Sequence, residues 1–320
     1  MIVRHSKVSV IAPARLHMGF IDLSGALGRH FGSIGVALNE ISTRLSVSQA
    51  AKRTITGPSA QRADNCLTMM CRVLNVSDQL NIEIEAAIPE HVGLGSGTQM
   101  SLAIGTALDR FYDLGLSVRD IASMMDRGLR SGIGIGIFER GGLVVDGGRG
   151  EKTVTPPVLA HFDIPADWRF ILVFDKRGQG LHGQQEIEAF KQLPPYPQQE
   201  AARLCYLLLM QGLPAVAEND LANFGHVISA LQQSVGEHFA PAQGGVFTSH
   251  EVAMAMQWLE KQGAVAIGQT SWGPTGFCAV VGAERAEALT FEARQAFRAF
   301  NDLSFVLASA RNRGGEVFVH

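Results

Sequence analysis

Apolar and polar positions along the chain predict a mixture of strands and helices. Residues 80–88 alternate apolar and polar side chains, which is typical of a half-buried strand, and 170–175 is a continuous apolar run typical of a buried one. Other strands are expected at 8–12, 142–146, 264–270, 276–281 and 316–319. Apolar residues at helical spacing predict helices around 100–111, 117–129, 184–193, 199–211, 215–235, 250–262 and 284–299. Because strands and helices mix without a strict repeat, the pattern favours an α+β architecture over a doubly wound sheet.

A stretch rich in glycine and proline at 147–167 is the candidate boundary between two domains. It predicts an N-terminal domain at 1–155 and a C-terminal domain at 165–320. The length of 320 residues agrees, since a domain commonly has about 150 residues.

The charge balance excludes several classes of partner. With 27 Lys and Arg against 30 Asp and Glu, the net charge is −3 and no basic stripe appears, so nucleic acid is not an expected ligand. No apolar run approaches the ~18 residues of a membrane span, and the first residues lack the pattern of a signal peptide. The four cysteines lack a disulfide-like spacing. Together these features predict a cytoplasmic protein that does not enter membranes.

Glycine is abundant and clustered. Of the 35 glycines, 23 gather at 19–35, 93–97, 128–150, 178–183 and 268–276. Ordinary turns would explain any single cluster. Several together favour loops that bring main-chain N–H groups close to an anion.

The segment 89–99 is the sharpest candidate among these loops, because it lies between a predicted strand and a predicted helix. A glycine loop that leads into a helix N-terminus presents unpaired N–H groups and a favourable dipole to phosphate. It is not a Walker P-loop, and alone it could be a turn and helix cap. The expected phosphate-binding residues are Gly93, Gly95, Ser96, Gly97, Thr98 and Gln99.

Three segments together resemble the GHMP kinase superfamily. They are the N-terminal block 13–19 (PARLHMG), the loop 89–97 with its GLGSG run, and the C-terminal glycine loop 269–276 (QTSWGPTG). The resemblance implies an N-terminal domain like the second domain of ribosomal protein S5, a ferredoxin-like C-terminal domain, and a site between them.

One departure from that superfamily concerns the reaction. Several of its kinases carry an Asp that activates the acceptor hydroxyl in a segment SGIDxxxxxxGG, whereas this chain has Gly134 there. Some members manage without this Asp, so the difference alone leaves a kinase open.

Further motifs (RSGIGIGIF, GGLVVDGG and ARNRGGE) are similar to the β-ribofuranosylaminobenzene 5'-phosphate synthases. This resemblance implies that phosphoribosyl pyrophosphate is joined to 4-aminobenzoate or 4-hydroxybenzoate, with loss of CO₂ and pyrophosphate. The product would be an early intermediate of tetrahydromethanopterin biosynthesis. Mg²⁺ on the pyrophosphate, no organic cofactor and a homodimer are expected.

Given that reaction, charge and position select further candidates. The expected catalytic residues are Arg15 as a phosphate clamp, His17 as a proton shuttle, and Asp22, which would hold Mg²⁺ with Ser96 or face the developing cation. Other expected substrate contacts are Arg130, Ser131, Lys176, Arg177, His182, Ser271, Trp272, Arg311 and Arg313. The alternatives are surface charges and salt bridges for the basic residues, a plain turn at Asp22, a structural hydrogen bond at His17 and a core position for Trp272.

Three rival functions stay open. The first is an ATP-dependent kinase of the same superfamily. The second is dinucleotide binding, because residues 178–183 fit GxGxxG after a strand, although Asp175, Lys176 and Arg177 intervene and no clean βαβ unit follows. The third is a sensor that binds the phosphorylated ligand without turnover.

Overall fold

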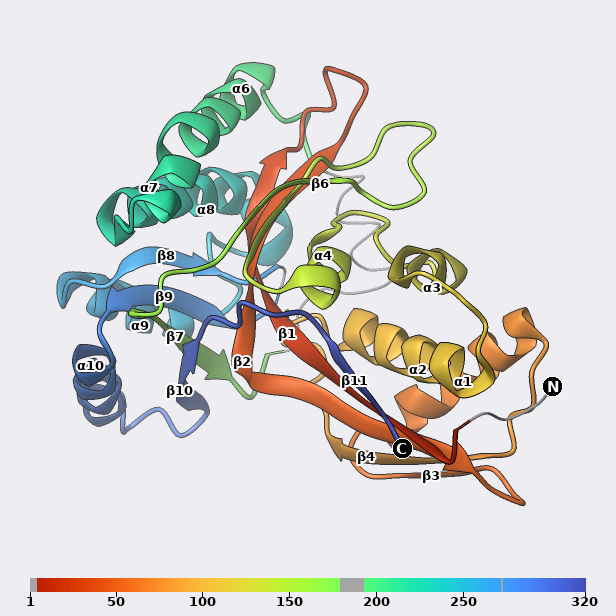
Figure 1. Cartoon of the computed structure of the whole chain (residues 1–320). Coiled ribbons are helices and arrows are strands. Elements are labelled where there is room, and N and C mark those ends of the chain that lie inside the picture. The colour runs from red at the N-terminus through yellow and green to blue at the C-terminus, as the bar shows by residue number, and fades with distance from the viewer. Residues whose placement is uncertain (1–4, 179–192, 272) are drawn as a thin grey trace.

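The computed structural model describes residues 5–178, 193–271 and 273–320, within which the chain forms two sheets and their covering helices (Figure 1). The first sheet is antiparallel except for one parallel edge pair, β3 with β4. Its central order is β11 (Glu316–Val319), β1 (Lys7–Asp22), β2 (Phe31–Gln49), β4 (Leu80–Ala86) and β3 (Thr54–Thr56), while β5 (Leu143–Asp146) pairs with β2 and β6 (Val158–Phe162) pairs with β5.

Helices α1 (Ala60–Leu74), α2 (Ser96–Tyr112), α3 (Val118–Met124) and α4 (Ile133–Arg140) lie on one face of this sheet (Figure 1). Their apolar sides form a core with the strands, in which Leu67 of α1, Leu102 of α2 and Ile82 of β4 are fully buried. The side chains of Ser117 and Asp120 form a capping box at the start of α3.

The second sheet has the antiparallel order β10 (Leu303–Ser309), β7 (Trp168–Asp175), β9 (Gly276–Val281) and β8 (Val265–Gln269). Helices α9 (His250–Lys261) and α10 (Ala283–Ala296) pack on it through residues such as Met256 and Leu289.

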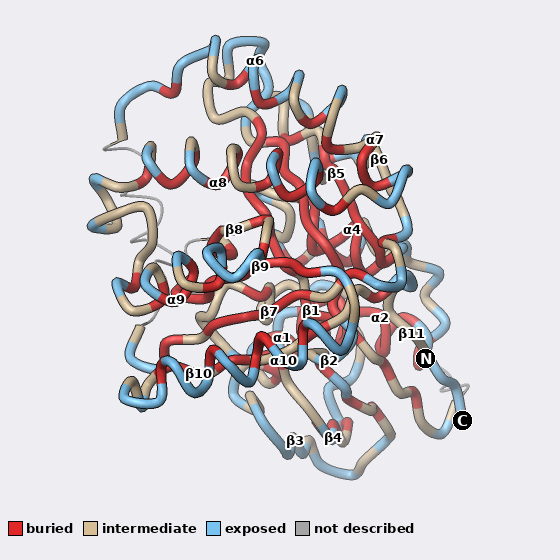
Figure 2. Tube along the Cα trace, turned by 90° about the vertical axis from the view of Figure 1, so that its left-hand side faces the viewer, coloured by how far each residue is buried: buried red, intermediate tan, exposed pale blue. Residues whose placement is uncertain are grey.

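A further helical group joins the two sheets. It consists of α6 (Gln198–Leu207), a π-helical turn η1 (Leu208–Gly212), α7 (Leu213–Ala217) and α8 (Leu221–Gln243). Leu16 of β1, Phe170 of β7 and Phe224 of α8 share one buried core. Figure 2 shows the buried trace concentrated in β1, β5, β7 and β9, whereas much of α6 and α10 faces outward.

Two segments differ from the sequence-based expectation. Residues 133–140 form α4, a helix that the sequence did not predict because glycine is a poor helix former. Small residues are needed there for close packing, since a Cβ on Gly136 would lie 2.7 Å from Val144 Cγ1. The helix expected over 215–235 is interrupted near its start, because the chain leaves helical geometry after α7. Asp220 then caps α8 by accepting a hydrogen bond from Asn223 N at 3.0 Å.

The two sheets do not follow the predicted boundaries at 155 and 165 in every part. Strand β6 extends the first sheet, and β11 returns to pair with β1, for example at Val8 and Val319. The first sheet therefore includes residues that the sequence assigned to the C-terminal domain. No helix within the described ranges has the length and apolar character that crossing a bilayer requires.

Candidate active site

Two glycine loops that come from different sheets touch each other. The first glycine loop (93–97) leads from β4 into α2, and the second glycine loop (270–275) joins β8 to β9. The hydroxyl of Thr270 donates to the carbonyl oxygen of Gly93 at 2.9 Å. A Cβ on Gly93, where φ is +82°, would lie 2.3 Å from the carbonyl oxygen of Thr270. The close approach of the two main chains therefore requires glycine at position 93.

A second contact ties the same loops together one residue earlier. The Thr275 hydroxyl donates to the carbonyl oxygen of Val92 at 2.8 Å. A Cβ on Gly273 would lie 2.5 Å from that oxygen. The paired loops thus form one surface at the junction of the two sheets.

Strand β1 is the third element of the junction. The His17 N–H donates to the Thr270 hydroxyl oxygen at 3.0 Å, so this hydroxyl links β1 to Gly93. The Arg15 N–H donates to Leu94 O at 3.1 Å, and its guanidinium donates to Gly93 O at 2.8 Å. The N-terminal block predicted from the sequence therefore lies directly against the first glycine loop.

Helix α2 begins at this junction with an open N-terminus. Gly95, with φ at +82°, is the N-cap, and no side chain of the described residues caps the helix. The first amide that bonds within the helix is that of Gln99, to Gly95 O at 3.0 Å. The amides of Ser96, Gly97 and Thr98 are consequently available to an anion, and the helix dipole favours negative charge there.

Two arginines that the sequence did not single out also lie at this N-terminus. A Cβ on Gly97 would be 3.0 Å from a terminal nitrogen of Arg62 and 3.8 Å from one of Arg127. Arg62, on α1, forms an ion pair with Glu90 at 2.6 Å and holds the pKa of that carboxyl below its usual range. Arg127, which follows α3, donates to Ser101 Oγ at 3.1 Å. Their positive charge complements the open amides.

Helix α4 brings Gly134 against the first turn of α2. The Gln99 side-chain amide donates to Gly134 O at 2.8 Å, and a Cβ on Gly134 would lie 3.0 Å from Thr98 Cγ2. The position that holds an Asp in several kinases of the superfamily thus borders the candidate anion site.

The start of α4 is fixed by a buried carboxylate. Asp146 accepts hydrogen bonds from Ser33 Oγ and from Gly132 N at 2.9 Å, and Ser131 Oγ lies 2.7 Å from Ser33 Oγ. Burial raises the pKa of Asp146, while these donors oppose the shift. Ser131 is therefore part of a structural network, with the half-buried Arg130 beside it.

The structure does not bring Asp22 to Ser96. Asp22 lies at the end of β1, seven residues beyond Arg15, which corresponds to roughly 20 Å of extended strand. Its carboxylate accepts from Ser24 N at 2.7 Å and from Ser24 Oγ at 2.6 Å, a local turn that supports the alternative interpretation of this residue. In the described part of the chain, no three His, Cys, Asp or Glu side chains are grouped as metal ligands would be.

Arg177 is engaged by carboxylates. It lies 2.9 Å from Asp175, 2.7 Å from Glu251 and 3.5 Å from Asp302. Asp175, and after it Glu251, raise the pKa of Arg177. The neighbouring Lys176 is exposed. The segment still borders the second glycine loop, because a Cβ on Gly178 would lie 2.9 Å from Pro274 Cβ.

The Asp175 carboxylate gives the protein a defined acid sensitivity. Hydrogen bonds from Arg177, and after them one from Ser249, lower its pKa from 3.8 to about 2. A carboxyl whose pKa is lower in the folded state stabilises the fold above the unfolded pKa, and that stability is lost as the pH falls toward 2. In Asp175→Asn we expect a Tm a few degrees lower at pH 7 and a flatter dependence of Tm on pH between 4 and 2, measured by calorimetry.

Asp302→Asn is the matched control for this acid sensitivity. Asp302 belongs to the same cluster but is half exposed and 3.5 Å from Arg177, so its contribution should be small. An unchanged slope in Asp175→Asn would contradict the assignment.

Arg311 and Arg313 lie at the other end of α4. The buried Arg311 forms an ion pair with Glu316, and the exposed Arg313 is 3.6 Å from the same carboxylate. A Cβ on Gly141, which follows the last residue of α4, would be 2.4 Å from the Arg313 main chain. Since α4 rises about 1.5 Å per residue, these arginines are separated from Gly134 by most of the length of the helix.

The remaining predicted residues fall into two groups. His182 and Trp272 lie outside the described residues. His17 and Ser271 line one small cavity beside the second glycine loop.

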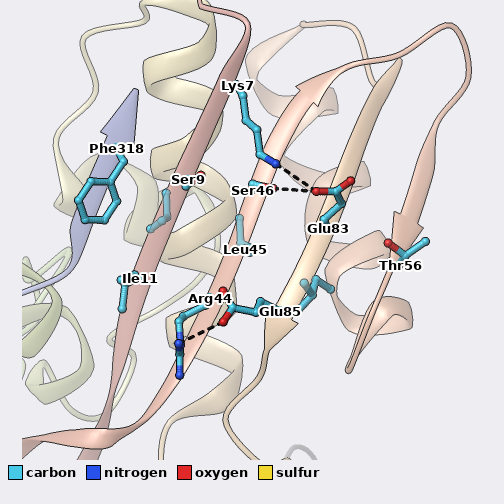
Figure 3. Close-up of a pocket in the computed structure, with 12 residues that line it drawn as sticks. Lys7, Ser9, Ile11, Arg44, Leu45, Ser46, Thr56, Glu83, Glu85 and Phe318 are labelled. Carbon is cyan, nitrogen blue, oxygen red and sulfur yellow. Dashed lines mark hydrogen bonds and ion pairs between the residues drawn. The ribbon is translucent and has the colours of Figure 1, made fainter. Parts of the chain in front are cut away.

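A larger groove lies on the outer face of the first sheet, away from the glycine loops (Figure 3). Its charged residues are paired: Lys7 with Glu83 at 3.1 Å, and Arg44 with Glu85 at 3.2 Å. This pairing gives no indication of a site for an anionic substrate.

Comparison with known proteins defines the class of this fold and site. Residues 61–138 match the N-terminal domain of the GHMP kinases, and residues 213–299 match their C-terminal domain. The crystal structure of homoserine kinase from Cytophaga hutchinsonii is similar with a TM-score of 0.70 over 99% of each chain, at 16% identity. The predicted two-part α+β fold of GHMP type is confirmed.

Sequence relatives place the chain more closely. It is 36% identical over 233 residues to β-ribofuranosylphenol 5'-phosphate synthase of Archaeoglobus fulgidus, which covers 69% of this chain and 74% of the relative. It is 35% identical over 249 residues to the synthase of that name from Methanocaldococcus jannaschii, with 69% and 75% covered. The chain therefore belongs to the β-ribofuranosylphenol 5'-phosphate synthase family, whose members are enzymes of the pentosyltransferase type.

Proposed function

We propose that this enzyme transfers the phosphoribosyl group of phosphoribosyl pyrophosphate to a ring carbon of a para-substituted benzoate, with release of pyrophosphate and CO₂. The observation that carries the proposal is the anion site at the N-terminus of α2, where open amides face three arginines. The names of the relatives describe a ribosylated phenol, which favours 4-hydroxybenzoate over 4-aminobenzoate as the acceptor. On this proposal the product enters tetrahydromethanopterin biosynthesis.

The leaving pyrophosphate would lie in the first glycine loop. Departure of pyrophosphate leaves positive charge on the ribose carbon and places negative charge on the leaving group. The amides of Ser96, Gly97 and Thr98 stabilise that negative charge without reorganising, because the backbone fixes them in advance. Arg15, Arg62 and Arg127 add positive charge from three different elements.

The acceptor provides its own nucleophile. An amino or hydroxyl group para to the carboxylate directs electron density onto the ring carbon that bears the carboxylate. That carbon forms a bond to the ribose as the bond between ribose and pyrophosphate breaks. CO₂ then leaves, and the electron pair of its bond to the ring restores the aromatic ring. A single displacement converts the α-linked donor into a β-linked product, so no covalent enzyme intermediate is needed. Glycine at position 134 suits this chemistry, since no hydroxyl has to be activated there.

The residues at the first glycine loop fit Mg²⁺ in a limited way. Mg²⁺ keeps several waters and binds through phosphate and few protein oxygens, and on this proposal the hydroxyls of Ser96 and Thr98 would hold it. When bound, it would neutralise charge on the pyrophosphate.

The decisive experiment supplies the substrates without ATP. With phosphoribosyl pyrophosphate and carboxyl-labelled 4-hydroxybenzoate, we expect equal amounts of labelled CO₂ and pyrophosphate, with slower release from 4-aminobenzoate. ADP formation that depends on a small alcohol would instead establish a kinase. Tight binding of the donor without any product would establish a sensor.

A further inference from the structure

The side chain of His17 is buried without a hydrogen-bond partner. It is 1% exposed, and neither ring nitrogen meets a donor or acceptor among the residues that the structure describes. Burial, and after it the charge of Arg15, lower the pKa of His17 well below its usual value. The ring is therefore neutral near pH 7, with one nitrogen as donor and the other as acceptor. Buried polar groups without partners are rare in folded proteins, so this ring indicates a missing ligand or water.

The imidazole borders a cavity of about 20 Å³. That volume suits one water or a single hydroxyl or amino group, because about 10–15 Å³ is the least that a water needs. The walls are largely apolar: Phe20 packs on the imidazole at 4.8 Å between ring centroids, and Phe239 lies 6.4 Å from Phe20. The hydroxyl or amino substituent of an aromatic ring has the matching size and chemistry.

The two glutamine side chains at the cavity are already bonded. The amide of Gln232 donates to Met18 O at 2.6 Å and accepts from Gln269 N at 2.9 Å. The side-chain oxygen of Gln269 accepts from Thr248 N at 2.9 Å. Among the described lining residues, His17 and Ser271 are thus left to recognise a polar group, and His17 is the buried one of the two.

The cavity adjoins the anion site. The main chain of His17 donates to the Thr270 hydroxyl, which in turn donates to Gly93 O. Ser271, the next residue of the second glycine loop, lines the cavity. A ligand held by His17 would therefore lie next to a donor held by the first glycine loop.

We propose that the imidazole of His17 binds the para hydroxyl or amino group of the aromatic acceptor, and that this polar group alone enters the cavity. The inference rests on the proposed function and names the residue that selects its acceptor. As the ring carbon attacks the ribose and the ribose–pyrophosphate bond breaks, the para hydroxyl passes its proton to the free nitrogen of His17. When CO₂ leaves, the electron pair of the ring–carboxylate bond restores the aromatic ring, and the para oxygen takes the proton back.

The test compares the binding of 4-hydroxybenzoate with that of unsubstituted benzoate by titration calorimetry. We expect the native protein to prefer 4-hydroxybenzoate by about tenfold, the worth of one hydrogen bond. His17→Leu should bind both acids about equally, and His17→Gln should retain part of the preference. The affinity for phosphoribosyl pyrophosphate should be unchanged in both variants.

Thr106→Val is the matched control, because the Thr106 hydroxyl on α2 is also buried without a described partner but lies outside the cavity. It should keep the native preference. Nitrogen NMR of the native protein gives a second measurement: 4-hydroxybenzoate should shift the His17 ring signals and benzoate should not. An unaltered preference in His17→Leu, equal binding of both acids to the native protein, or unshifted ring signals would overturn the inference and leave a buried water as the occupant. These binding measurements need no turnover. They can therefore fail while CO₂ release still occurs, and CO₂ release can fail while the binding preference is found.

Discussion

Replacement of Gly93 by alanine is expected to lower kcat/KM at least about 100-fold, since a misplacement of about 1 Å at a reacting centre can have that effect. The new Cβ would lie 2.3 Å from Thr270 O, so the two glycine loops would have to separate by roughly 1 Å to reach an ordinary contact. That movement would also stretch the hydrogen bonds that Thr270 makes to Gly93 and His17. Steady-state kinetics with phosphoribosyl pyrophosphate would measure the loss.

Gly115→Ala separates this clash from simple backbone strain. Gly115 also has a positive φ, at +73°, but a Cβ there would meet nothing within 4 Å. Both alanine variants should lose a similar, small amount of stability from the unfavourable φ. If Gly115→Ala lost activity as strongly as Gly93→Ala, contact between the loops would not be the cause.

Gly134→Asp is expected to weaken binding of phosphoribosyl pyrophosphate about 100-fold or more. The new carboxylate would extend from a Cβ 3.0 Å from Thr98 Cγ2, beside the open amides of α2. There it would compete with the pyrophosphate for those amides and repel its charge, in a partly buried place where screening is weak. Fluorescence or calorimetric titration with the donor would measure the affinity.

Gly134→Ala reports the steric part of this effect alone. Its methyl group needs a shift of a few tenths of an ångström at Thr98, so the loss should be several-fold at most. Equal losses in the two variants would show that charge at position 134 is immaterial. The appearance of ATP-dependent phosphorylation in Gly134→Asp would contradict the proposed function.

The elements with one clear period were predictable from the sequence. Strand β4 alternates regularly, and apolar residues at helical spacing predict α2. Strand β2 could not be found in this way, because it is buried continuously at 32–38 and then changes its pattern. Helix α4 could not be predicted for a different reason. Its glycines allow close packing but have a low helix propensity.

The glycine loops of the site were predictable, but their charged neighbours were not. Resemblance to a superfamily directed attention to motifs, and the first glycine loop lies against Arg15 as the motifs suggest. Arg62 and Arg127 belong to no motif and reach the loop only through tertiary packing. The ion pairs of Arg177 with Glu251 and Asp302 could not be predicted either, because these carboxylates are far away in sequence.

The pairing of β11 with β1 has a consequence for synthesis on the ribosome. Val8 cannot pair until its partner Val319 has been synthesised. Elongation at about 5–20 residues per second makes this delay roughly 15–60 s. During this time one edge of β1 is bare, and a bare edge is a template for pairing with other chains. The nascent first sheet therefore needs shielding until residue 319 emerges, and a fragment cut between the predicted domains would carry the exposed edge permanently.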